Sequence, residues 1–168
     1  MIKDERLLMR KTIIGSNYMG YYDKTRVACR VIVVRKGKIL LSYETKTDQW
    51  MIPGGGLEDY ESEEDCCVRE FAEETGFVVR VSTCLLEIEE YYENCKWIHR
   101  YFLGKCIDKT KTCLSDREKK VGMEARWISI KTCKEIFSKY QEYSKSNEMR
   151  RGMYLREFTA LNELEGCY

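Results

Sequence analysis

The 168-residue sequence has little proline and histidine, with one residue of each, and it has no long apolar run. A membrane-spanning helix needs roughly 18 or more apolar residues in a row, and no stretch approaches this. Residues 1–11 are charged throughout and have no apolar segment typical of a signal peptide. The lone histidine, His99, cannot form a zinc site with other histidines. We therefore expect a protein that neither crosses a membrane nor binds structural zinc.

Neither sign of charge dominates, because 29 lysines and arginines face 28 aspartates and glutamates. This balance provides no general attraction for a polyanion, so we expect no stable nucleic-acid partner, although a local basic patch stays open. The nine cysteines are odd in number and scattered, and no pair has the Cys-x-x-Cys spacing. They are interpreted as buried thiols in a reducing compartment, which predicts a cytoplasmic location.

Hydrophobic residues make up 43% of the chain and charged residues 34%, which is typical of a folded protein. The length fits one domain covering residues 1–168. The assembly is left open, with a homodimer as the candidate.

The pattern along the chain predicts strands that alternate with helices. Apolar and β-branched runs predict strands over residues 26–34, 39–43, 77–89, 97–106 and 125–130. Helices are expected over residues 62–75, 131–140 and 148–164, the last with an apolar stripe formed by Tyr154, Phe158 and Leu161. Ser62 is a suitable N-cap and Gly76 a suitable C-terminal residue for the first helix. The expected fold is therefore α+β, a mixed β-sheet flanked by helices in an α/β/α sandwich.

The most informative feature is a group of glutamates on the first predicted helix. Glu70, Glu73 and Glu74 are spaced i, i+3 and i+4, which places them on one helix face. Val68 and Ala72 lie on the opposite side and are expected to pack on the sheet. Three carboxylates on one face repel one another, and a bound divalent cation removes this cost. Carboxylate oxygens without nearby histidine or cysteine ligands favour Mg²⁺ or Mn²⁺ over Zn²⁺.

A solvated acidic helix face is the alternative interpretation of these glutamates. The longer pattern over residues 55–77 argues against it. Its matching positions are Gly55, Glu61, Arg69, Glu70, Glu73, Glu74 and Gly76. This pattern resembles the Nudix box, and the chain is similar to the Nudix hydrolase family of bacterial, MutT-like proteins. Many members have glycine where this chain has Tyr60, a difference expected to affect only the turn before the helix.

The resemblance implies an enzyme in which water attacks a diphosphate linkage with the help of bound metal ions. Catalytic roles fall on Arg69, Glu70, Glu73 and Glu74. Metal ligands would be the three glutamates together with the backbone carbonyl of Gly55. Arg69 would orient the box carboxylates, and Glu61 would be its partner.

The general base varies within the family, and three glutamates are candidates here. They are Glu70, Glu118 and Glu124. For Glu118 and Glu124, an ordinary exposed position is the competing interpretation. Tyr91, Tyr92 and Trp97 are candidates for stacking on a nucleobase, and core or strand aromatics are the alternative.

A nucleotide-like small molecule is the expected substrate class. A nucleoside triphosphate, cleaved to monophosphate and pyrophosphate, is favoured. ADP-ribose or another nucleoside diphosphate derivative is the second candidate, although the chain lacks the proline that marks one group of ADP-ribose hydrolases. A nucleotide-sensing module without turnover is the third. The sensing role is disfavoured because all the box carboxylates are present.

Overall fold

The computed structural model describes residues 8–168, so the expectation about a signal peptide falls largely outside the described residues. The strands are β1 (Met9–Ile14), β2 (Lys24–Arg35), β3 (Lys38–Glu44), β4 (Gln49–Met51), β5 (Gly54–Gly56), β6 (Phe77–Tyr92), β7 (Cys95–Lys109) and β8 (Met123–Ser129). The helices are α1 (Glu63–Thr75), α2 (Asp116–Val121), α3 (Ile130–Ser138), the 3₁₀ segment η1 (Lys139–Tyr143) and α4 (Glu148–Glu163). Within the described part of the chain, no helix is long and apolar enough to cross a membrane.

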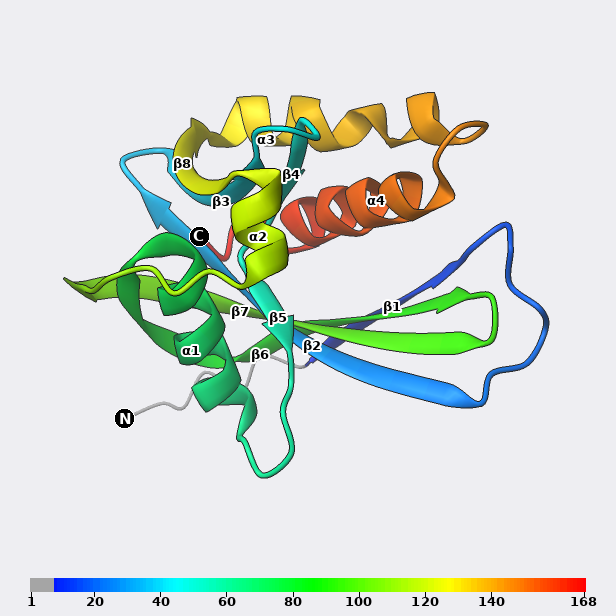
Figure 1. The fold of residues 1–168 in the computed structure, drawn as a ribbon, viewed down its shortest axis with the longest axis horizontal. Helices are drawn as coiled ribbons and strands as arrows, with labels where there is room; N and C mark the ends of the chain where they lie inside the picture. The colour runs from blue at the N-terminus through cyan, green and yellow to red at the C-terminus, as the bar shows by residue number, and fades with distance from the viewer. Residues whose placement is uncertain (1–7) are drawn as a thin grey trace.

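The strands form one mixed sheet in the order β1-β6-β7-β2-β3-β4, with β5 paired to β2 and β8 paired to β3. β1 and β6 are parallel, as are β2 and β7, whereas β6 and β7 are antiparallel. Helix α1 lies on one side of the sheet and α3 and α4 lie on the other (Figure 1). The predicted mixed sheet between helical layers is therefore confirmed.

The predicted elements correspond to β2, β3, β6, β7, β8, α1, α3 and α4, with ends that differ by a few residues. Four short elements were not predicted, namely β1, β4, β5 and α2. β5 consists only of glycines, which have low intrinsic strand preference, so its pairing with β2 depends on tertiary contacts. The second predicted helix ends earlier than expected, at Ser138, and continues as the 3₁₀ segment.

Strand β2 separates two apolar cores, because its side chains alternate between the two faces of the sheet. Cys29, Val31 and Val33 join the core beneath α1. Ile32 joins the core beneath α3 and α4, which also contains Tyr154 and Leu161. Burial on both faces explains why this strand reads as a nearly continuous apolar run.

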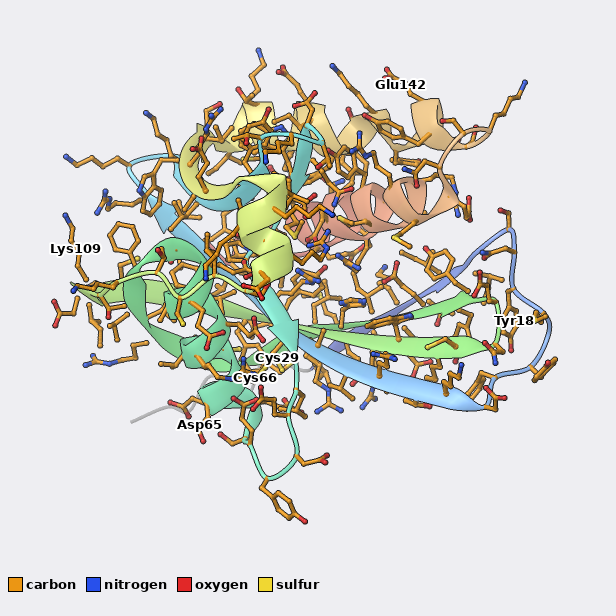
Figure 2. All side chains as sticks on the ribbon, in the orientation of Figure 1. Tyr18, Cys29, Asp65, Cys66, Lys109 and Glu142 are labelled. Carbon is orange, nitrogen blue, oxygen red and sulfur yellow. The ribbon has the colours of Figure 1, made fainter. Side chains whose placement is uncertain are left out.

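Helix α1 begins and ends where its capping residues predict. The Ser62 hydroxyl accepts a hydrogen bond from the Asp65 backbone N–H, and Gly76 has a left-handed φ of 72°. The side that packs on the sheet is formed by Cys66, Cys67 and Phe71, and Cys66 points toward Cys29 of β2 (Figure 2).

The expectation for the packing face of α1 is met in part, because Val68 packs against the core beneath α1 from a partly buried position. Val68 and Ala72 are only half-buried, whereas Glu74 is buried. Periodicity assigned every glutamate to the outside of the helix. Glu74 instead turns inward, because Ser42 of β3 supplies a hydrogen-bond donor beneath the helix.

A buried polar cluster joins the sheet to α4 and was not predicted. The Arg156 guanidinium donates to Glu90, Glu157 and the Tyr101 hydroxyl at 2.7–3.1 Å. The His99 Nε2 lies 2.9 Å from a Glu90 carboxylate oxygen. Each of these side chains is at most 6% exposed, so the charges must be matched within the cluster.

This cluster predicts that acid destabilises the fold. Burial and the charge of Arg156 lower the pKa of His99 from 6.5 to about 3. Burial alone would raise the pKa of Glu90, but Arg156 and the His99 hydrogen bond lower it from 4.5 to about 2. The contribution of neutral His99 to the free energy of unfolding is fully present above pH 6.5 and is lost as the pH falls toward 3. That of Glu90 is lost between pH 4.5 and 2, at about 1.4 kcal/mol per pKa unit.

The measurement is urea unfolding of the wild type and His99→Gln from pH 8 to 4, both in EDTA. Burial raises the pKa of Glu74 to about 8. The contribution of Glu74 to stability therefore falls as the pH rises over this range, whereas that of His99 increases. The informative quantity is therefore the difference between the two proteins. The wild type should lose several kcal/mol more than His99→Gln below pH 6.5, and parallel curves would contradict the prediction.

Candidate functional site

The segment between β4 and α1, here called the glycine loop, contains Gly54 and Gly55, and both make very close contacts. A Cβ atom on Gly54 would lie 2.1 Å from the Cys29 carbonyl oxygen, and the φ of Gly54 is 149°. A Cβ atom on Gly55 would lie 2.4 Å from the carboxyl carbon of Glu70. Gly54 is therefore required by the backbone of β2, whereas a side chain at Gly55 would displace the Glu70 carboxylate.

Arg69 lies at the centre of the carboxylate group. Its Nε and Nη2 donate to the two oxygens of Glu61 at 2.6 and 2.9 Å. Its Nη1 donates to Glu70 Oε1 at 2.7 Å and lies 3.5 Å from Glu73 Oε2. The Arg69 hydrogen bonds hold the pKa of Glu61 at about 2, so Glu61 stays ionised. The pairing of Arg69 with Glu61 that the resemblance implies is therefore present, and the orienting role of Arg69 stays a prediction.

Glu70 and Glu74 differ from Glu73 in their surroundings. Burial raises the pKa of Glu70, and Arg69 partly opposes this shift. Burial also raises the pKa of Glu74, whose Oε2 accepts hydrogen bonds from Ser42 at 2.7 Å and from the Gly54 N–H at 3.3 Å. Glu73 remains partly exposed, with 37% of its side chain accessible. Glu70 and Glu73 therefore share Arg69 as a partner, whereas Glu74 is bound by Ser42 and Gly54.

The donor set fits a hard divalent cation. Glu70 lies against Gly55 and is partly buried, and buried Glu74 accepts from the neighbouring glycine, so a positive charge here would relieve their mutual repulsion. Oxygen donors of this kind suit Mg²⁺ or Mn²⁺. In residues 8–168, no three acidic, histidine or cysteine side chains are already arranged as a metal site.

The two candidate bases outside the helix have different positions. Burial is the main cause of the raised pKa of Glu70 and Glu74, and the charge of Glu118, on α2, contributes to both shifts. The Oε2 of Glu118 also accepts from the Ser115 N–H at 2.7 Å, closing the cap of α2. Glu124 lies at the surface and pairs with Arg126. Of these two, Glu118 is the one whose charge acts on Glu70 and Glu74.

A cavity of about 460 Å³ lies between the sheet and the start of α4. Its apolar lining includes Met51, Tyr92, Trp97, Met149 and Met153. Its polar lining includes Lys24, Arg26, Arg30, Glu90, His99 and Arg156. Of its lining residues, Arg30 is paired with Gly54 in the β2–β5 ladder, and Met51 precedes the glycine loop in the chain. The size and the mixed lining are those of a site for a small organic ligand.

The three candidate aromatics take different positions around this cavity. The Trp97 ring lines it and lies under the Arg26 guanidinium, whose central carbon is 5.5 Å from the ring centroid. Tyr92 also lines it, but its ring is held between Gly15 and Gly152, where added Cβ atoms would lie 2.1 and 1.9 Å away.

Tyr91 does not line the cavity. Consecutive residues of a strand point to opposite faces of the sheet, so Tyr91 and Tyr92 cannot both face the cavity. The Tyr91 ring instead packs at 5.3 Å from that of Tyr18, at the far end of the long strands (Figure 2). Tyr91 therefore lies outside the lining of this cavity, and its role in stacking on a nucleobase stays a prediction.

Three buried charged residues in the cavity lining, Arg30, Glu90 and Arg156, were not predicted from the sequence. Arg30 interrupts the apolar run of β2, and this was the available signal that one charged side chain is buried there. Glu90 and Arg156 gave no such signal, because isolated charges in a strand or helix are normally exposed.

Tyr60, at the tip of the loop before α1, occupies a position that favours glycine. Its φ is 67°, in the left-handed region, and its side chain is fully exposed. The expected effect on the turn is small, because the backbone adopts this conformation despite the Cβ atom. The cost for a residue other than glycine is about 1–2 kcal/mol.

Comparison with known proteins agrees with these features. The model of the NUDIX domain matches residues 24–146. The RNA pyrophosphohydrolase of Mannheimia succiniciproducens is 28% identical over 121 residues, 70% of this chain and 54% of that protein. An mRNA-decapping enzyme subunit 2 from Saccharomyces cerevisiae is 35% identical over 68 residues, 40% of this chain and 6% of that protein.

Solved structures show the same fold. A NUDIX hydrolase from Nitrosomonas europaea has a TM-score of 0.57 and 19% identity, over 82% of this chain and 90% of that one. The MutT protein from Methanosarcina mazei Go1 has a TM-score of 0.56 and 17% identity, over 84% and 96%. The chain belongs to the Nudix family. It spans at most about half the length of the two curated relatives described above.

The conformation of Tyr60 predicts that glycine at this position stabilises the fold. Tyr60→Gly should be about 0.5–1 kcal/mol more stable than Tyr60→Ala, because alanine keeps the Cβ atom that disfavours a positive φ. The measurement is thermal unfolding of both variants beside the wild type. Equal stability of the glycine and alanine variants would show that the left-handed conformation is not adopted.

Proposed function

We propose that this protein hydrolyses a diphosphate linkage in a nucleotide with the help of a divalent cation. The favoured substrate is a nucleoside triphosphate, cleaved to the monophosphate and pyrophosphate. One observation carries the proposal: the carboxylate face of α1 meets the glycine loop, and Arg30, which pairs with Gly54 of that loop, lines a cavity suited to a nucleoside.

The cation would be Mg²⁺, with Mn²⁺ as a substitute, held by Glu70, Glu73, Glu74 and the carbonyl of Gly55. When bound, such a cation lowers the pKa of water and neutralises phosphate oxygens. Arg69 would position these carboxylates, since it already bonds to Glu70 and approaches Glu73. Glu118, whose charge acts on Glu70 and Glu74 from α2, is the preferred candidate for the general base.

The nucleoside would occupy the cavity. Its base would stack on Trp97, and the edge of Tyr92 would form part of the wall. A second hollow, of about 530 Å³, shares Arg26 and Trp97 with the cavity and reaches Gly56. A nucleotide with its base in the cavity could therefore extend its phosphates along this path toward the box.

An RNA with phosphates at its 5′ end is an alternative substrate, because one relative at 28% identity is named as an RNA pyrophosphohydrolase. The exposed Lys24 and Arg26 at the cavity lining supply positive charge for a phosphodiester chain. ADP-ribose or another nucleoside diphosphate derivative remains a further candidate. A sensing module without turnover is disfavoured by the complete set of box carboxylates. We also propose a cytoplasmic location, which fits the nine unpaired cysteines, and leave a homodimer as the candidate assembly.

Neutralising Glu73 or Glu74 should abolish most turnover. Glu73→Gln and Glu74→Gln keep the side-chain volume but remove a ligand charge, so kcat should fall by about 100-fold or more. Glu64→Gln is the matched control, because Glu64 lies on the same helix and is exposed. Activity is measured by chromatography of every product from nucleoside triphosphates, ADP-ribose and 5′-triphosphate RNA in Mg²⁺.

The same assay tests the reaction. The wild type should lose activity in EDTA, regain it with Mg²⁺ or Mn²⁺, and release pyrophosphate from a triphosphate. Orthophosphate as the first product, or near-wild-type turnover in both glutamine variants, would overturn the proposed function. Product from none of the three substrates, with Mn²⁺ still bound, would favour the sensing role.

A further inference from the structure

Arg30 is a charged residue in the middle of the buried strand β2. It is 9% exposed, and its side chain lies on the same side of the sheet as α4. Burying an ionised group is costly unless hydrogen bonds and opposite charges compensate. The contacts of its guanidinium therefore indicate what the residue does.

The guanidinium joins two groups that are otherwise separate. Its Nη1 donates to the Ile52 carbonyl oxygen at 2.8 Å. Its Nε donates to His99 Nδ1 at 3.3 Å and lies 3.9 Å from a Glu157 carboxylate oxygen. One side chain thus connects the start of the glycine loop to the buried cluster that is fastened to α4.

The Ile52 carbonyl lies just before Pro53, Gly54 and Gly55. On the other side of this loop, the Gly54 N–H donates to Glu74, and Gly55 lies against the Glu70 carboxylate. The backbone of Arg30 is itself paired with Gly54 in the β2–β5 ladder. The loop is therefore held by α1 from one side and by Arg30 from the other.

We propose that Arg30 is a positioning residue that couples the cavity to the glycine loop. Arg30, His99 and Arg156 all line the cavity, so a ligand bound there contacts the same cluster that holds the Ile52 carbonyl. This inference rests on the proposed function and deepens it. Filling the cavity restricts the cluster and, through Arg30, the positions of Gly54 and Gly55.

A consequence follows for substrates that lack a nucleobase. Binding energy from a part of the substrate remote from the reaction can serve to order the reacting groups, so losing that part lowers kcat as well as raising KM. Tripolyphosphate or ribose 5-triphosphate should therefore be turned over with a kcat about tenfold or more below that of a nucleoside triphosphate.

The direct test is Arg30→Lys, which keeps the charge but cannot hold both the Ile52 carbonyl and His99 with a planar fork. Its matched control is Arg35→Lys on the same strand, an exposed arginine over the Trp127 ring. Arg30→Lys should lower kcat about 10- to 100-fold with a smaller change in KM. It should also weaken binding of Mn²⁺ alone about tenfold, measured by electron paramagnetic resonance without substrate.

A third readout needs neither metal nor substrate. The backbone amide signals of Gly54 and Gly55 in ¹⁵N NMR spectra should shift in Arg30→Lys and stay unchanged in Arg35→Lys. If Arg30→Lys matches Arg35→Lys in kcat, Mn²⁺ affinity and these amide signals, the positioning role is wrong. If the wild type hydrolyses nothing, the proposed function fails, and the Mn²⁺ and NMR readouts still decide on Arg30.

Two variants of His99 cover the case in which Arg30→Lys does not fold. His99→Asn offers an amide oxygen to the Arg30 Nε, whereas His99→Leu offers no acceptor. The glycine amide signals and Mn²⁺ affinity should be closer to wild type in His99→Asn than in His99→Leu. Equal behaviour of the two variants in both readouts would overturn the proposed coupling.

Discussion

The close approach of the glycine loop to strand β2 and helix α1 is the constraint on which the site depends. Gly54 leaves no room for a side chain against the Cys29 backbone, and a side chain at Gly55 would displace the carboxylate of Glu70. The loop is held to the sheet by pairing of Gly54 with Arg30 and to the helix by the hydrogen bond from the Gly54 N–H to Glu74. The carboxylate face of α1 and the backbone of β5 thereby become two walls of one site.

Charge is distributed unevenly around this loop. On one side, Arg69 keeps Glu61 ionised and bonds to Glu70, whereas buried Glu74 has only the Ser42 hydroxyl and a backbone N–H as donors. On the α4 side, two arginines and two glutamates balance within one buried cluster around neutral His99. The buried charges on the α4 side therefore balance one another without a ligand. On the α1 side the carboxylates outnumber the cationic partners, so a bound cation would stabilise them.

The parts of the fold that could be predicted are those encoded by local signals. Ser62 and Gly76 set the ends of α1 by capping, and the apolar run of β2 indicated a strand buried on both faces. Strand β5 could not be predicted, since three glycines form a strand only because β2 pairs with them. Within the site, the spacing of Glu70, Glu73 and Glu74 was readable, but the inward turn of Glu74 required the Ser42 hydroxyl of another strand.

By itself, the sequence determined the box helix, the acidic face it carries and the family to which that spacing belongs, because helical periodicity and capping act over a few residues. Only the tertiary structure decided that Trp97 faces a cavity while Tyr91 does not, and that Arg30 meets His99 from 69 residues away. Such meetings depend on which strands pair and in what register. A shift of one residue would turn each of these side chains to the opposite face of the sheet.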